Sequence, residues 1–184
     1  QFVNCIKGIK EACIELNFPV VSGNVSFYNQ TDGKSILPTP TIGGVGLIKN
    51  ISEHCLGTVN KNDVYYVVGE TDIKATALAL VSESSQVQIE DVNIKVNLDE
   101  ERRNGQFILH LLNEKLISNA HDVSDGGIGL KLCELAIAND LGFEVIEGSL
   151  EYFFNETQAR YIISINPLKE KLFISLAKDK KVPI

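Results

Sequence analysis

Apolar residues recur every three or four positions in several stretches of the chain, with charged residues between them. In the first stretch Phe2, Ile6 and Ile9 follow this spacing and continue to Leu16. Such spacing is typical of a helix that buries one face. It predicts helices over residues 2–17, 74–82, 99–118, 126–139 and 168–177, with Asp99 as the cap of the third of these.

Shorter apolar runs bounded by Gly, Pro, Asn or Asp predict strands. These runs lie at 19–22, 39–48, 63–68, 119–123, 143–146 and 160–165, while 87–96 alternates only in part and is ambiguous. Because the predicted strands alternate with helices, we expect an α/β (α+β) fold with a mixed sheet packed with helices. Near residues 49–61 the composition turns polar and the charge changes sign, which predicts two domains, 1–50 and 51–184.

Charge and composition exclude several classes of function. The net charge is −7, and residues 83–101 carry six acidic side chains against one lysine, a surface that repels nucleic acid. No apolar run approaches the roughly 18 residues that a membrane helix needs, so we expect no membrane partner. The four cysteines form no CxxC pair, which argues against structural zinc and favours thiols in a reducing cytoplasm. The chain begins with Gln1 and contains no Met, which indicates part of a longer protein.

A first group of polar residues, Ser22-Gly-Asn-Val-Ser-Phe-Tyr-Asn29, follows the predicted strand at 19–22. Gly23 allows the backbone to approach a ligand closely. Asn24 offers an amide oxygen that suits a hard cation such as Mg²⁺, and Ser26 offers a hydroxyl to a phosphate or substrate oxygen. The alternative is a tight turn whose side chains satisfy their own backbone.

A second group, His121-Asp-Val-Ser-Asp-Gly-Gly127, joins a predicted strand to a predicted helix. Asp125 or the serine before it can cap the helix, while Gly126 and Gly127 leave the first N–H groups accessible to an anion. Asp122 or Asp125 could hold the metal that accompanies such an anion. The alternative is a capped helix without a ligand.

A third group is Phe153-Phe-Asn-Glu-Thr-Gln-Ala-Arg160. Glu156, Thr157 and Gln158 can bond to a ligand, and Arg160 can face a phosphate. The alternative is a surface turn that contains an ion pair.

These motifs carry a resemblance to a known family. The blocks Pro19–Asn29 and Pro38–Gly46 closely resemble phosphoribosylformylglycinamidine synthase, in the synthetase subunit of its small, multi-subunit form. The segments His121–Gly127 and Asn155–Arg160 look like later motifs of that family, with its usual Gly-Glu-Ser-Gln altered to Asn155-Glu-Thr-Gln. The resemblance covers only the second half of the family's protein.

The resemblance implies a fold and a reaction. Residues 1–50 would be the end of an aminoimidazole-ribonucleotide-synthetase-like N-terminal domain, and residues 51–184 most of the following C-terminal domain. The whole protein would use ATP and Mg²⁺ to convert formylglycinamide ribonucleotide and ammonia into the amidine, ADP and phosphate. Its partners would be the N-terminal half of its own chain, a glutaminase subunit and a small bridging subunit.

The resemblance also implies roles for single residues. Gly23 would contact ATP, Asn24 would bind Mg²⁺ and Ser26 would contact the substrate. The family's catalytic histidine lies in its first half, so no catalytic residue is expected in this chain. The later motifs would serve either an auxiliary nucleotide site or only the architecture, and their residues are Asp122, Asp125, Gly126, Gly127, Glu156, Gln158 and Arg160.

Two rival interpretations remain. One is a sister ATP-using enzyme of the same superfamily, such as aminoimidazole ribonucleotide synthetase, thiamine-monophosphate kinase, selenophosphate synthetase or the hydrogenase maturation factor. The other is a non-catalytic module that holds a nucleotide or docks partner subunits. The complete reading frame separates them, because an upstream half with its own histidine and acidic metal ligands favours the enzyme.

Overall fold

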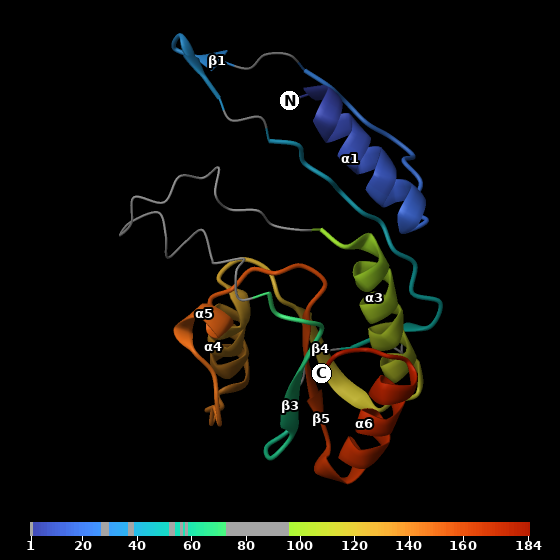
Figure 1. Cartoon of the computed structure of the whole chain (residues 1–184), viewed down its shortest axis with the longest axis vertical. Helices are drawn as coiled ribbons and strands as arrows, with labels where there is room; N and C mark the ends of the chain where they lie inside the picture. The colour runs from blue at the N-terminus through green and yellow to red at the C-terminus, as the bar shows by residue number, and fades with distance from the viewer. Residues whose placement is uncertain are drawn as a thin grey trace. The chain divides into compact units, whose positions relative to one another are not determined.

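The computed structural model describes residues 2–26, 30–36, 39–51, 54–55, 57, 59–72 and 96–184 (Figure 1). The predicted helix at 74–82, nearly all of the ambiguous segment 87–96 and most of the acidic stretch 83–101 lie outside these residues. The chain divides into two units, residues 1–49 and residues 50–184.

The larger unit is built on a three-stranded antiparallel sheet. Its strands are β3 (Val64–Val68), β4 (Ile117–Asp122) and β5 (Tyr161–Ile165), in the order β3-β5-β4. The last residue of β3 and the last residue of β4 both pair with Tyr161, the first residue of β5. The loops that follow β3 and β4 therefore meet the loop that precedes β5 at one edge of the sheet. The strands predicted at 63–68, 119–123 and 160–165 are confirmed, with small shifts of their ends.

Helices cover both faces of this sheet (Figure 1). The apolar faces of α3 (Leu98–Asn113) and α6 (Glu170–Asp179) pack with Ile163 and Ile165 of β5. On the opposite face, α4 (Gly127–Asn139) and α5 (Leu150–Phe153) contribute to a second cluster around Ile162. This split follows from the strand, because successive side chains of β5 point to opposite faces.

The helix boundaries follow local signals. The helices predicted at 99–118, 126–139 and 168–177 are confirmed as α3, α4 and α6, although α3 ends at Asn113 and a short 3-10 turn, Pro167–Lys169, precedes α6. None of the helices in the described part of the chain is long and apolar enough to cross a membrane.

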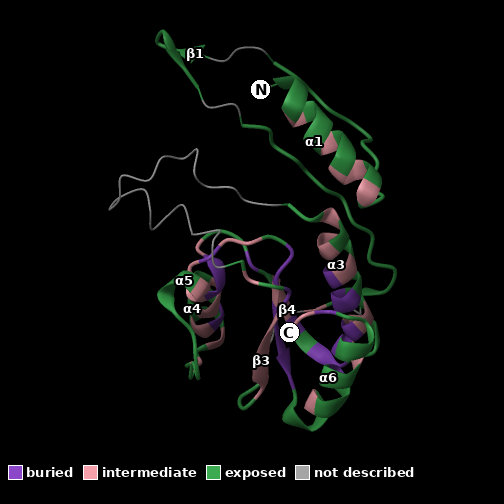
Figure 2. Cartoon of the chain, viewed as in Figure 1, coloured by how far each residue is buried: buried purple, intermediate pink, exposed green. Residues whose placement is uncertain are grey.

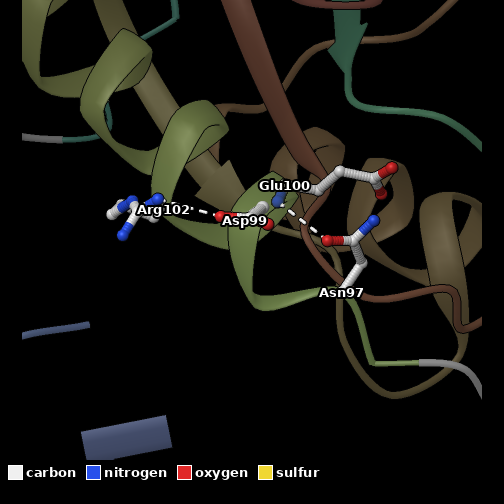
Figure 3. A network of polar contacts seen from close by, with 4 residues as sticks. All are labelled: Asn97, Asp99, Glu100 and Arg102. Atoms are coloured by element: carbon white, nitrogen blue, oxygen red, sulfur yellow. Dashed lines mark hydrogen bonds and ion pairs between the residues drawn. The ribbon is translucent and has the colours of Figure 1, made fainter. Parts of the chain in front are cut away.

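The predicted cap of α3 is wrong. Asn97 has an extended backbone and its Oδ1 accepts the N–H of Glu100 at 3.2 Å (Figure 3). Asp99 lies inside the first turn and instead pairs with Arg102, with 2.8 Å between Oδ1 and the guanidinium nitrogen. The helix begins one residue earlier than the apolar pattern indicated, so the capping position moves to the asparagine.

The strand predicted at 143–146 is also wrong, because this segment has no regular structure. Its Phe143 packs edge-on against Tyr65 of β3, with ring centroids 4.7 Å apart. Ile146 is 98% exposed. The aromatic side chain therefore takes a place in the second core cluster while the backbone around it forms no ladder.

The smaller unit contains α1 (Phe2–Glu15), which confirms the first predicted helix, and a short hairpin of β1 (Gln30–Thr31) and β2 (Lys34–Ser35). The two turn residues, Asp32 and Gly33, both have positive φ, at 51° and 77°. Such a backbone suits an Asp-Gly turn between antiparallel strands. The Asp-Gly pair is a hairpin signal in the sequence, although no strand was predicted directly on either side of it.

None of the described residues between 2 and 49 is buried (Figure 2). The strands predicted at 19–22 and 39–48 are wrong, since the described residues there have no regular structure and are exposed. Val21 and Val45 are 90% and 94% exposed. An apolar run forms a strand only when another strand pairs with its backbone, and none of the strand pairings among the described residues includes either run.

Candidate functional site

The loop that the family resemblance assigns to ATP is exposed throughout its described part. Gly23, Asn24 and Ser26 each lie on the surface of the smaller unit. A Cβ placed on Gly23 would meet no other atom within 4 Å. The backbone at Gly23 is thus accessible to a ligand, while residues 27–29 and residue 38 of the two motif blocks lie outside the described residues.

The second and third motifs come together in the larger unit. The backbone N–H of Val123 donates to the carbonyl of Arg160 at 2.9 Å, which joins the loop after β4 to the loop before β5. The loop after β3, residues 69–72, contacts the same place through Thr71 and Asp72. We call residues 69–72, 121–127 and 155–160 the loop cluster.

The start of α4 lies in the loop cluster. Gly126 and Gly127 have φ of 73° and 66°, and Gly126 is the capping residue without any side-chain cap. The Gly126 N–H donates to Oε1 of Glu156 at 2.9 Å. The predicted cap by Ser124 or Asp125 is therefore wrong, because Gly126, with a left-handed backbone, takes the capping position and no side chain caps the helix there.

Gly127 packs directly against the third motif. A Cβ on this residue would lie 2.4 Å from the carbonyl oxygen of Asn155 and 2.6 Å from that of Phe153. Real Cβ atoms do not approach oxygen so closely, and the positive φ also disfavours a side chain. The close contact between the two backbones explains why position 127 requires a residue without a Cβ.

Arg160 faces the protein interior. The side chain is 2% exposed, and its guanidinium donates to three neutral oxygens: Thr71 Oγ1 at 3.0 Å, Asn155 O at 2.5 Å and Thr157 O at 2.9 Å. Burial lowers the pKa of Arg160 to about 10. The alternative of a surface turn with an ion pair does not describe this residue, because its neighbours are hydroxyl and carbonyl groups and it is buried.

The two positions that depart from the family's motif both bind Asp72. The Asn155 side chain is fully buried, and its Nδ2 donates to the carbonyl of Asp72 at 2.6 Å. The N–H of Asp72 donates to the Thr157 hydroxyl at 3.1 Å, and that hydroxyl also bonds to Asn155 Oδ1. Thr71 and Asp72 were not among the predicted site residues, although polar residues directly after a predicted strand are a usable signal.

The remaining predicted residues lie at the rim of the loop cluster. Asp122, Asp125 and Gln158 are exposed. Burial, with a further contribution from Lys131, lowers the pKa of the neighbouring His121 below its ordinary value. Within the described residues, no group of three or more His, Cys, Asp or Glu side chains gathers as a metal site would.

Two apolar grooves lie apart from the predicted site residues, although Pro19 and Val20 of the first motif block line one of them. One, of about 430 Å³, is lined by His110, Glu114 and three leucines of the larger unit. The other, of about 450 Å³, lies along α1 in the smaller unit. Neither is lined by any of the predicted site residues, so the candidate site rests on the loops.

Comparison with protein families matches both parts of the chain. Residues 1–48 match the family described as "AIR synthase related protein, N-terminal domain". Residues 60–184 match "AIR synthase related protein, C-terminal domain".

Curated relatives agree with this match along the whole chain. The chain is 41% identical over 184 residues to "Phosphoribosylformylglycinamidine synthase subunit PurL" of Cereibacter sphaeroides. It is 42% identical to the protein of the same name from Ruegeria pomeroyi. In both comparisons all of this chain is covered, but only 25% of the relative, so the chain spans about a quarter of their length.

Solved structures support the fold. The structure "T. maritima PurL complexed with FGAR" matches with a TM-score of 0.58 and 16% identity, over 72% of this chain and 24% of that one. "T. maritima PurL complexed with ATP" matches with a TM-score of 0.52 and 17% identity, over 72% and 22%. The chain therefore belongs to the AIR synthase related protein family, and its sequence relatives are PurL subunits of phosphoribosylformylglycinamidine synthase.

Proposed function

We propose that this chain is part of an ATP-dependent carbon–nitrogen ligase of purine biosynthesis, phosphoribosylformylglycinamidine synthase. The whole protein would convert formylglycinamide ribonucleotide, ATP and glutamine-derived ammonia into formylglycinamidine ribonucleotide, ADP and phosphate. The observation that carries the proposal is the identity of about 40% with PurL subunits over the entire chain. The likeness to PurL structures that hold FGAR and ATP supports these two ligands.

Within that protein, we assign ligand contacts to the exposed loop at 22–26. Gly23 lets the ATP phosphates approach the backbone, because a Cβ placed on it would meet nothing within 4 Å. Ser26 offers its hydroxyl to the substrate. These roles rest on the motif, and the exposure of all three side chains is compatible with them.

Asn24 fits one position around Mg²⁺. Its amide oxygen is a hard ligand and it is exposed, but one amide does not make a metal site. Mg²⁺ usually keeps several waters and binds through one or two protein groups together with substrate phosphates. When bound there, the ion would stabilise the negative charge that develops during phosphoryl transfer. The other protein ligands are proposed to come from another part of the longer chain.

We further propose how the chain divides and what completes it. Residues 1–50 would be the end of the second synthetase-like N-terminal domain, and residues 51–184 most of the C-terminal domain. The absence of any buried residue among the described residues of 2–49 supports a need for covering by the N-terminal half of the protein. A glutaminase subunit and a small bridging subunit would complete the complex, in the cytoplasm.

The test is an assay of the full-length gene product with formylglycinamide ribonucleotide, ATP, Mg²⁺ and an ammonium salt, with ADP formation as the readout. We expect ADP formation that depends on the ribonucleotide. Asn24→Ala should raise the Mg²⁺ concentration for half-maximal rate at least tenfold, whereas Asn4→Ala, an exposed asparagine on α1, should not.

Each rival interpretation has its own outcome. No turnover with formylglycinamide ribonucleotide or with any substrate of the sister enzymes would favour a non-catalytic module. ATP consumption with formylglycinamidine ribonucleotide, thiamine monophosphate or selenide in place of the expected substrate would favour a sister enzyme. A Mg²⁺ titration of Asn24→Ala that overlays the wild-type curve would remove Asn24 from the metal site.

A further inference from the structure

The N-terminus of α4 is the place in the loop cluster where an anion is expected. Unpaired N–H groups and the helix dipole give such an end a partial positive charge. In this chain a carboxylate of the protein already lies there, since Glu156 Oε1 accepts the N–H of Gly126. The next N–H, of Gly127, donates to the carbonyl of Ser124 at 3.0 Å.

The space beside the helix start is filled by backbone. The carbonyls of Phe153 and Asn155 lie so close to Gly127 that even a methyl group would overlap with them. A phosphate is much larger than a methyl group. This side of the helix start is consequently closed by the same segment that supplies Glu156.

Arg160 fixes the backbone on both sides of Glu156. Its guanidinium donates to the carbonyl of Asn155, the residue before, and to the carbonyl of Thr157, the residue after. Its third bond, to Thr71, ties the same segment to the loop after β3. The side chain of Asn155 adds a further bond to the carbonyl of Asp72. The position of the Glu156 carboxylate is therefore set by a buried network.

From this arrangement we propose that Glu156 is a built-in anion: its carboxylate occupies the N-terminus of α4 where a ligand phosphate would otherwise bind, and Arg160 is the positioning residue that holds it there. The loop cluster is then a self-contained clamp that joins β3, β4, β5 and α4. This assigns the second-half motifs to architecture, and it does not depend on the reaction proposed for the whole protein.

Chemical rescue tests the carboxylate directly. Glu156→Ala in the full 184-residue chain removes the carboxylate and leaves room for a small added carboxylate such as formate. Loss of such a cap should lower the thermal midpoint by about 4 °C. Formate should restore at least half of that loss, while chloride at the same ionic strength should not. The matched control is Glu144→Ala, an exposed carboxylate of the same unit, which should show neither effect.

Amide signals of the wild-type chain and of one variant test whether the helix start is closed to ligands. In ¹H–¹⁵N spectra, the amide signals of Gly126 and Gly127 should stay in place when inorganic phosphate or Mg²⁺ with ADP is added. Arg160→Lys should speed hydrogen exchange of the Gly126 amide at least tenfold, because lysine cannot bond to both carbonyls that flank Glu156.

Several results would overturn the proposal. One is movement of the Gly126 and Gly127 signals with phosphate or ADP, which would show an open ligand site. Others are an unchanged midpoint in Glu156→Ala, or rescue by chloride as effective as rescue by formate. If Glu156→Ala fails to fold, Glu156→Gln decides, because an unchanged midpoint together with unchanged Gly126 exchange would contradict a role for the negative charge.

Discussion

In residues 2–49 the side chains that the motif assigns to ligands are exposed, whereas in residues 50–184 most of the motif residues contact one another. Asn24 and Gly23 lie on the surface of a unit whose described residues include none that is buried. Glu156 and Arg160 instead bond to backbone groups of their own unit. A polar motif that satisfies itself stabilises a fold, while one that remains exposed is available to bind something else.

The two units also differ in what holds them together. The larger unit has an apolar core on each face of its sheet, including Phe173 and Ile163 at 0% exposure. The smaller unit exposes apolar residues such as Val45 and Leu47, at 94% and 89%. Because burial of apolar surface is the main source of stability, we expect only the larger unit to be stable without further parts of the protein.

The largest expected effect is on catalysis. The 184-residue chain by itself should give no detectable amidation, because its proposed ATP loop lacks the groups that complete the site. The full-length gene product should be active in the same assay. Ribonucleotide-dependent ADP formation by the 184-residue chain alone would contradict the claim that the exposed loop of the smaller unit needs further parts of the protein.

Core truncations should separate the units by stability. Phe173→Ala removes a buried ring that packs against Phe107 and Tyr66, and should lower the free energy of unfolding by about 3–5 kcal/mol. Val45→Ala changes an exposed residue and should stay within about 0.5 kcal/mol. Urea unfolding followed by circular dichroism measures both. Equal losses would mean that the smaller unit has a core of its own.

Two glycine substitutions sharpen the comparison further. Gly127→Ala should lower the free energy of unfolding by about 2–3 kcal/mol, because its Cβ would overlap two carbonyls at a positive φ. Gly23→Ala should leave stability unchanged, since its Cβ meets open space, but should weaken ATP binding in the full-length protein. Thermal unfolding checks the first, and ATP titration of the full-length protein checks the second.

The smallest expected effect concerns the contact between β3 and α6. The Tyr66 hydroxyl donates to Glu170 Oε1 at 2.6 Å, and this bond and burial raise the pKa of Tyr66 to about 12. Tyr66→Phe should cost about 1 kcal/mol at neutral pH. A raised tyrosine pKa contributes stability that is complete below about pH 10 and lost as pH rises through about 12. The difference between wild type and Tyr66→Phe should therefore shrink above pH 10, and a constant difference would contradict the bond.

Much of the fold could be predicted from the sequence where an apolar run also has a neighbouring strand to pair with. The runs at 63–68 and 160–165 became paired strands because each lies beside another strand of the sheet. The runs at 39–48 and 143–146 did not, since none of the strand pairings among the described residues includes them. Periodicity reports what a segment can bury, but it does not report whether a neighbour exists.

The same limit on prediction from sequence applies to the candidate site. The sequence indicated which residue types lie in the motifs, and it placed the glycines at the start of α4. The sequence did not show that the Glu156 carboxylate accepts the N–H of Gly126. It also did not show that the buried Arg160 side chain donates to backbone carbonyls. Both depend on contacts between segments that are distant in the chain, which local patterns do not encode.

Hydrogen exchange of the 184-residue chain, followed peptide by peptide with mass spectrometry, tests the central claim most directly. We expect strong protection in β3, β5 and α3, and in the Gly126 amide, because these N–H groups are bonded within a cored unit. Peptides from residues 2–49 should exchange almost as fast as unfolded chain. Comparable protection in both units would contradict the account, because the smaller unit would then be stable without the rest of the protein.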